Sequence, residues 1–125
     1  MNFIQEPEER IYSLKGSDVA FKWVYAKINE TVELKSIIWS VENKTDGKEY
    51  ALIVERFNGT VTVNPQIPKA YLNRVEKTGQ ATLLVKGVTY EDTTTFSCLL
   101  RTKRGPLFDT RSRIQLVVTG TSLGN

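Results

Sequence analysis

Hydrophobic and polar residues alternate along most of this chain with the two-residue period that is typical of β-strands. In residues 19–25, for example, valine, phenylalanine, tryptophan and tyrosine occupy every second position. Comparable runs, rich in β-branched and aromatic residues, recur between turn signals such as Asp46-Gly47 and Asn58-Gly59. Helical periodicity is hard to find, so the pattern predicts an all-β protein.

Nine short strands are predicted from these runs and from the turns that separate them. Nine strands in about 120 residues are typical of a sandwich of two sheets. We expect one domain over residues 1–119, followed by a small polar segment, 120–125, with the composition of a linker or tail. The predicted strands cover residues 11–14, 19–25, 36–43, 49–57, 60–63, 71–77, 81–85, 95–102 and 107–119.

Two residue counts restrict the chemistry of this chain: its 125 residues include no histidine and one cysteine. Without imidazole there is no Ser/His/Asp or Cys/His nucleophile system and no His-ligated zinc. One cysteine cannot form an intramolecular disulfide, a redox pair or a four-cysteine zinc site. Because the sequence also has no phosphate-binding or calcium-binding loop motif, we expect no enzyme activity, no cofactor and no metal site.

A spaced set of residues in the second half of the chain carries a family resemblance. The set reads Leu83-x-Val85-x-x-Val88-x-x-x-Asp92-x-x-x-Phe96-x-Cys98. It resembles the corner between strands E and F of immunoglobulin domains, where an aromatic residue stands two positions before a cysteine. Upstream, the segment Gly16-x-x-Val19-x-Phe21-x-Trp23 is similar to strand B, and Trp39 falls where the tryptophan of strand C belongs. The resemblance covers essentially the whole chain.

The resemblance implies an immunoglobulin-like sandwich of the variable type, because the separation of Trp39 from Asp92 leaves room for strands C′, C″ and D. It also implies that Arg74 and Asp92 form a structural ion pair. Trp23 stands where strand B has its cysteine, and Phe96 stands where a tyrosine is usual, so we expect no disulfide between strands B and F. The predicted core residues are Trp23, Trp39, Phe96 and Cys98. The thiol is interpreted as buried and inert, with an intermolecular disulfide as the alternative.

Three features together resemble the membrane-distal domain of hydroid allorecognition receptors: the lack of the disulfide, the segment Tyr71-Leu-Asn-Arg-Val75 and a threonine-rich E–F corner. In that family, a single-pass membrane protein binds the same domain on an opposing cell in an allele-specific manner. The resemblance therefore implies an extracellular domain with a protein partner, bound homophilically. We expect no nucleic acid partner and no membrane insertion by this segment, since no apolar run approaches the roughly 18 residues that span a bilayer.

Three glycosylation sequons support a cell-surface location. Asn29, Asn43 and Asn58 each begin an Asn-x-Thr motif, and all three fall in predicted loops or turns, where glycans can be attached. Chance would give about one such motif in a chain of this composition. Three motifs are a mild excess, and coincidence stays open as the alternative.

The candidate site is the outward face of the strands that would correspond to C, C′, F and G. If Ile37, Trp39 and Val41 face the core, the residues between them face solvent. In this interpretation the face has an apolar centre, and its charged residues set register and specificity. A shift of one residue in 49–57 or 107–119 would exchange face and core. The predicted face comprises Ile38, Ser40, Glu42, Ile53, Glu55, Leu99, Arg101, Arg113 and Gln115, with Ile38, Ile53 and Leu99 at its centre.

Two other functions stay open on the sequence. The same face could bind a different receptor or ligand, or the domain could be a structural spacer in a larger protein. Residues 99–115 carry five Lys or Arg side chains and one Asp. This basic segment is interpreted as a solvated hairpin, with binding of anionic glycans as the alternative.

Overall fold

The computed structural model describes residues 1–26 and 32–120, which form ten strands and three single-turn 3₁₀ helices. The elements of the first half are β1 (Asn2–Gln5), β2 (Arg10–Leu14), β3 (Val19–Ala26), β4 (Leu34–Glu42), β5 (Glu49–Arg56) and β6 (Val61–Val63). Those of the second half are η1 (Lys69–Tyr71), β7 (Val75–Thr78), β8 (Ala81–Val85), η2 (Tyr90–Asp92), β9 (Thr95–Thr102), η3 (Pro106–Phe108) and β10 (Thr110–Thr119). The predicted all-β class is confirmed.

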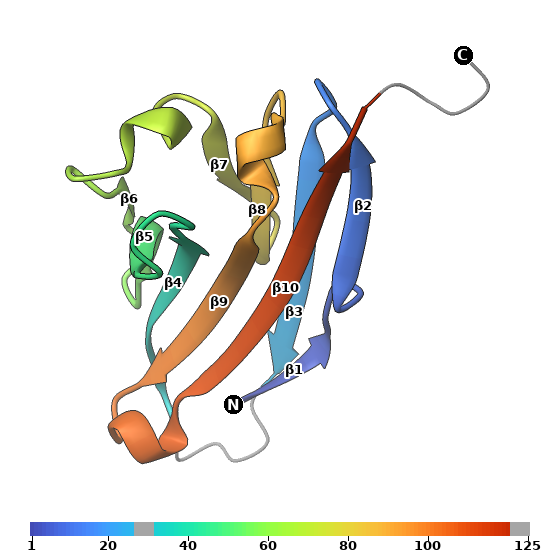
Figure 1. Ribbon diagram of the computed structural model, residues 1–125. Coiled ribbons are helices and arrows are strands. Elements are labelled where there is room, and N and C mark those ends of the chain that lie inside the picture. The colour runs from blue at the N-terminus through green and yellow to red at the C-terminus, as the bar shows by residue number, and fades with distance from the viewer. Residues whose placement is uncertain (27–31, 121–125) are drawn as a thin grey trace.

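The strands form two sheets that pack against each other, as Figure 1 shows. One sheet has the order β1-β3-β8-β7, and the other has the order β2-β10-β9-β4-β5-β6. Neighbouring strands are antiparallel except for β2 and β10, which are parallel. The chain crosses from one sheet to the other between β1 and β2. The two-sheet sandwich predicted from the sequence is therefore present.

A single hydrophobic core lies between the sheets, and its largest side chains are fully buried. The ring of Phe21 stacks on Phe96, with 4.9 Å between centroids, and on Trp23, with 5.9 Å. The indole N–H of Trp39 on β4 donates to the carbonyl of Ala81 on β8, at 3.3 Å. This hydrogen bond joins the two sheets. Aromatic packing thus occupies the interior of a sandwich that has no disulfide.

The largest differences from the predicted element boundaries are at three places. β1 lies in an acidic N-terminal segment where no strand was predicted, and it pairs with β3. The first part of 71–77 is not strand, because the chain leaves η1 through Asn73, whose positive φ of 63° interrupts the extended backbone. The last strand begins after η3 and not at Leu107. Pro106 favours this helical turn, since its fixed φ suits the first helical position.

Cys98 lies on β9, where it is fully buried and free. Burial raises the pKa of the Cys98 thiol well above its ordinary value. The resulting contribution to stability is fully present below the pKa of the unfolded thiol, and it is lost as the pH rises above that value. The protonated, inaccessible thiol is a poor nucleophile.

We therefore predict that maleimide labels Cys98 at pH 8 at least about a hundredfold more slowly in the native protein than in the urea-unfolded chain. Mass spectrometry of timed samples measures both rates. Equal rates would place the thiol at the surface and would favour the intermolecular disulfide.

Candidate interaction face

The outward face of the six-stranded sheet has a small apolar centre that spans three strands. Leu99 on β9 lies directly opposite Ile38 on β4, and Ile38 lies opposite Val54 on β5. All three side chains are partly exposed. Arg111 on β10 lies opposite Leu99 and begins the basic side of the face. We call this outward surface of β2, β10, β9, β4 and β5 the sheet face.

The prediction that Ile53 lies at the apolar centre is wrong, because Ile53 is only 1% exposed and faces the core opposite Trp39. The cause is a bulge in β5, where Ala51 pairs with Ser40 while Leu52 has no opposing residue. A bulge adds one residue and so reverses the parity of the strand beyond it. Outward Ala51 is therefore followed by two buried residues, and Val54 takes the outward position.

The same bulge moves Glu55 away from the sheet face, which corrects a second prediction. Glu55 pairs with Ile37, whose side chain is in the core, so it points towards the other sheet. There its carboxylate forms an ion pair with Lys77 on β7, at 3.0 Å. Glu55 therefore contributes to the contact between the sheets and not to the charge of the sheet face.

The remaining predicted residues lie on the outward side of their strands. Ser40 pairs with Ser97, which in turn pairs with Arg113 on β10. Arg101 lies opposite Ser36 on β4 and has its guanidinium Nε 4.0 Å from Asp109. The sheet face carries predicted residues Ile38, Ser40, Glu42, Leu99, Arg101, Arg113 and Gln115.

Glu49 connects the basic and acidic sides of the sheet face within one molecule. Its carboxylate lies 3.2 Å from Nη1 of Arg111 and 4.0 Å from Nε of Arg113. Since β9 and β4 separate β5 from β10, these side chains extend across two strands. The small residues Ser40 and Ser97 lie on those two strands and are buried, which leaves room for the longer side chains above them. The sequence did not predict the contact between Glu49 and Arg111, because it depends on the order of the strands in the sheet.

A hollow of about 580 Å³ lies beside this cluster, on the side of β2 and β10. Arg10 Nε donates to Oε1 of Gln115 across its edge, at 3.1 Å. Tyr12 is exposed there, and Arg113 presents its guanidinium. The hollow thus combines an aromatic ring, two cations and one carboxylate. Its lining residues are Glu9, Arg10, Tyr12, Thr95, Arg113 and Gln115.

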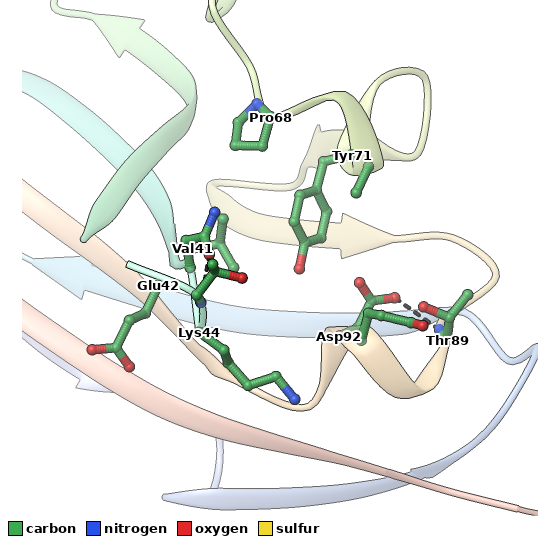
Figure 2. Close-up of a pocket in the computed structure, with 11 residues that line it drawn as sticks. Val41, Glu42, Lys44, Pro68, Tyr71, Thr89 and Asp92 are labelled. Carbon is green, nitrogen blue, oxygen red and sulfur yellow. Dashed lines mark hydrogen bonds between the residues drawn. The ribbon is translucent and has the colours of Figure 1, made fainter. Parts of the chain in front are cut away.

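A second cavity, of about 280 Å³, lies at one end of the sandwich, between the β4–β5 turn, η1 and η2. Figure 2 shows Tyr71 and Asp92 on one side of it, Val41 on the other, and Glu42 pointing away. Arg74 donates to the Asp92 carboxylate, which also accepts from the backbone N–H of Thr89, at 2.8 Å. The predicted ion pair between Arg74 and Asp92 is thus present in the structure.

Phe96 has no hydroxyl group, but the side chain of Tyr71 brings an aromatic hydroxyl to the E–F corner. Its ring meets Phe96 edge-on, with 6.0 Å between centroids. Burial, and then the neighbouring Asp92 carboxylate, raise the pKa of Tyr71 well above its ordinary value. No sequence pattern predicted that Tyr71 lies beside Phe96, since the two residues are 25 positions apart. The contacts of Tyr71, Arg74 and Asp92 beside this cavity therefore stabilise the E–F corner.

The candidate glycosylation sites occupy turns in the described part of the chain. The side-chain carbonyl of Asn43 accepts from the N–H of Thr45 at 2.8 Å, and that of Asn58 accepts from the N–H of Thr60 at 3.0 Å. Asn29 lies outside the described residues. Whether any of the three carries a glycan stays a prediction.

The tip of the predicted basic hairpin carries exposed apolar side chains that the sequence pattern did not indicate. Leu107 in η3 is 95% exposed, and the neighbouring Phe108 lies beneath the guanidinium of Arg104, 4.6 Å from its ring centroid. Phe57, in the turn after β5, is 67% exposed and lies 4.6 Å from the ammonium of Lys103. Leu107 and Phe108 were predicted to begin the last strand, where their side chains would have alternated between core and solvent, and Phe57 was predicted to end the strand 49–57.

Comparison with known proteins identifies the fold. No protein-family model and no curated protein matches the sequence. The structure of murine CRIg superposes with a TM-score of 0.72 at 14% identity, and the match covers 94% of this chain and 97% of that one. The fold is that of an immunoglobulin variable-type domain.

Two further solved structures are similar to this immunoglobulin-like domain. The tandem V-type regions of VCBP3, a v-region-containing chitin binding protein, match at a TM-score of 0.68 and 18% identity, over 94% of this chain and 46% of that one. The extracellular domain of the voltage-gated sodium channel beta4 subunit matches at a TM-score of 0.64 and 16% identity. This match covers 90% of this chain and 92% of that one. The predicted variable-type sandwich without the B–F disulfide is thus confirmed.

The described residues contain neither a metal-binding cluster of side chains nor a membrane-spanning helix. Across 1–26 and 32–120, three or more His, Cys, Asp or Glu side chains nowhere gather as they would to hold a metal ion. In the same ranges, no helix is both long enough and apolar enough to cross a bilayer.

Proposed function

We propose that this immunoglobulin-like domain mediates homophilic recognition between opposing cells through its sheet face. The observation that carries the proposal is the composition of that face. Partly exposed Leu99, Ile38 and Val54 lie side by side, with arginines on β10 and carboxylates on the β4–β5 side. Grouped apolar side chains with a charged rim are typical of protein interfaces.

The charge distribution of the sheet face suits a second copy of the same surface. Arg111 and Arg113 lie on one side of β9, and Glu42 and Glu49 lie on the other. A two-fold axis near β9 places the basic side of each copy over the acidic side of its partner, so the surface is self-complementary. A cation of one copy then meets a carboxylate of the other at two symmetric positions.

Similar proteins support a recognition role without naming a partner for this chain. The sodium channel beta4 structures are described as parallel homodimers that explain a role in cell-cell adhesion. The resemblance to hydroid allorecognition receptors supports the finer proposal, that binding is allele-specific and that the domain is the extracellular part of a single-pass membrane protein. Exposed charges such as Glu42 and Arg113 would then vary between alleles.

Self-association of the purified domain tests this proposal. We expect wild-type protein to form dimers in sedimentation equilibrium and to aggregate beads that display it. Leu99→Arg should raise the dimer Kd at least about tenfold, because it places an unpaired charge in the apolar centre. Leu107→Asp, at the distant tip, is the matched control and should leave the Kd unchanged.

Two results would contradict the proposal. A wild-type domain that stays monomeric and does not aggregate beads, even at high surface density, would favour a spacer or a ligand for another protein. A dimer that Leu99→Arg does not weaken would place the interface on another surface.

The exposed tip supports a second candidate function, which is recognition of a different protein. Leu107, Phe108 and Phe57 are exposed at the ends of their loops, close to Lys103 and Arg104. Such a tip suits a partner with an apolar pocket and acidic rim. In this case, Leu107→Asp should abolish staining of partner-bearing cells by the multivalent domain, whereas Leu99→Arg should not.

A further inference from the structure

We propose that the hollow beside β10 receives the Glu42 carboxylate of a second copy at Arg113, and that Glu49 of the same chain competes for that guanidinium. The inference rests on the proposed homophilic function and specifies its contacts. It makes Arg113 the recognition residue. It makes Glu49 an internal competitor that weakens the dimer.

Glu42 is the carboxylate on the β4–β5 side that is free to reach a partner. Within the described residues, its neighbour Glu49 forms ion pairs in the same molecule, whereas Glu42 forms none. Glu42 is exposed at the end of β4, and Figure 2 shows its side chain pointing away from the cavity at that end of the sandwich. Its carboxylate is therefore available above the sheet face.

Arg113 is the cation best placed to bind that carboxylate. Its side chain is 58% exposed, and its Nε lies 4.0 Å from Glu49, at the limit of an ion pair. Glu49 lies closer to Arg111, at 3.2 Å. Since a guanidinium has five N–H donors in a planar fork, Arg113 keeps donors that a second carboxylate can occupy.

The surroundings of Arg113 favour an incoming acidic side chain. The hollow of about 580 Å³ contains the cations of Arg10 and Arg113 and one carboxylate, that of Glu9. Its wall includes the exposed ring of Tyr12, against which the methylene groups of a glutamate can pack. The hollow therefore has both the space and the charge to receive a glutamate.

The strand order allows both contacts of a symmetric dimer to form together. The hollow lies on the β2 and β10 side of β9, and Glu42 lies on β4, on the other side. A two-fold axis that runs parallel to β9, in the plane between the two facing sheets, exchanges these two positions. Each copy then gives one Glu42 to its partner and receives one in return.

Glu49 reduces the affinity of this dimer because it neutralises part of the charge on Arg113 in the free molecule. An exposed ion pair of this kind is worth a small amount of free energy. Glu49→Gln keeps the size of the side chain and removes its charge. We therefore expect this variant to lower the dimer Kd about threefold, although the substitution deletes a charged residue of the face.

Sedimentation equilibrium of the whole 125-residue chain tests the inference with six single variants and one double variant. Arg113→Gln and Glu42→Gln should each raise the Kd at least about tenfold, and Glu49→Gln should lower it. The control Glu76→Gln, on the other sheet, makes the same change in net charge as Glu42→Gln and Glu49→Gln. It should leave the dimer Kd unchanged. Arg113→Glu and Glu42→Arg should each abolish dimers, and the double variant should restore them, because the pair then forms with reversed charges. Unchanged thermal melts show that each variant folds.

The outcomes separate this inference from the function on which it rests. If Leu99→Arg abolishes the dimer but Glu49→Gln raises the Kd, or the double variant does not recover, the sheet face stands and the contact between Glu42 and Arg113 is wrong. If the wild-type domain neither dimerises nor aggregates beads, both proposals are overturned. Equal effects of Glu49→Gln and Glu76→Gln would assign the change to net charge and reject internal competition.

Discussion

Replacing Trp39 with alanine is expected to lower the free energy of unfolding by about 4 kcal/mol. The indole is fully buried on β4 and donates to the carbonyl of Ala81 in the opposite sheet. Alanine leaves a cavity between the sheets and removes the donor from that carbonyl, and both effects destabilise the native state. Urea denaturation followed by circular dichroism measures the loss.

Tyr12→Ala is the matched control for this substitution. Tyr12 is also aromatic, but it is exposed on β2, so its removal should change the free energy of unfolding by less than about 0.5 kcal/mol. A loss below about 1.5 kcal/mol in Trp39→Ala would show that the core closes around the cavity and that the tryptophan is not its main support.

Removing the Asp92 carboxylate should have the next largest effect, a loss of about 3 kcal/mol in Asp92→Ala. Asp92 is buried and accepts from Arg74 and from the backbone of Thr89. Without it, a partly buried guanidinium has lost its counter-ion, and the η2 turn has lost its capping interaction. The aromatic hydroxyl of Tyr71 loses its neighbouring charge as well.

An exposed ion pair provides the comparison for Asp92. Glu76 and Lys86 meet at 3.1 Å on the surface of the other sheet, where both side chains are about half exposed. Glu76→Ala should therefore cost less than about 0.5 kcal/mol. If Asp92→Ala unfolds at the same urea concentration as Glu76→Ala, the buried pair at the E–F corner does not stabilise the fold, and its role would lie elsewhere.

The core could be predicted from the sequence because it depends on residue type and on local alternation. Trp23, Trp39, Phe96 and Cys98 are apolar residues within clear strand patterns, and all four are fully buried. The family resemblance added the partner of Asp92, a contact that spans 18 residues. Neither inference required the exact register between strands.

The sheet face was predicted less well because register does matter there. The bulge at Ala51 and Leu52 involves one extra residue, and no turn signal or charge in 49–57 marks it. Every side chain of β5 beyond the bulge points to the opposite face from the one that simple alternation predicts. The prediction therefore assigned Ile53 and Glu55 to the wrong face. In β10 and β9, which pair without a bulge, the outward positions of Arg113 and Leu99 were predicted correctly.

The loss of the B–F disulfide is accommodated by packing around Trp23, although the polar group of that side chain has no partner. The indole N–H of Trp23 is buried and has no hydrogen-bond acceptor among the described residues. Such a group costs free energy. The stacked rings of Trp23, Phe21 and Phe96 offset this cost through the apolar area that they bury. The core thus relies on the volume of its aromatic side chains.

The parallel pairing of β2 with β10 also determines how the domain responds to tension. The chain begins at one end of the sandwich, and β10 finishes at the other (Figure 1). A force applied between the two ends of the domain would pull β2 and β10 in opposite directions along their common axis. The hydrogen bonds between Arg10–Leu14 and Gln115–Thr119 would then be loaded together in shear and not opened one by one. Once they break, no covalent cross-link halts extension, so this single ladder sets the force at which the domain unravels.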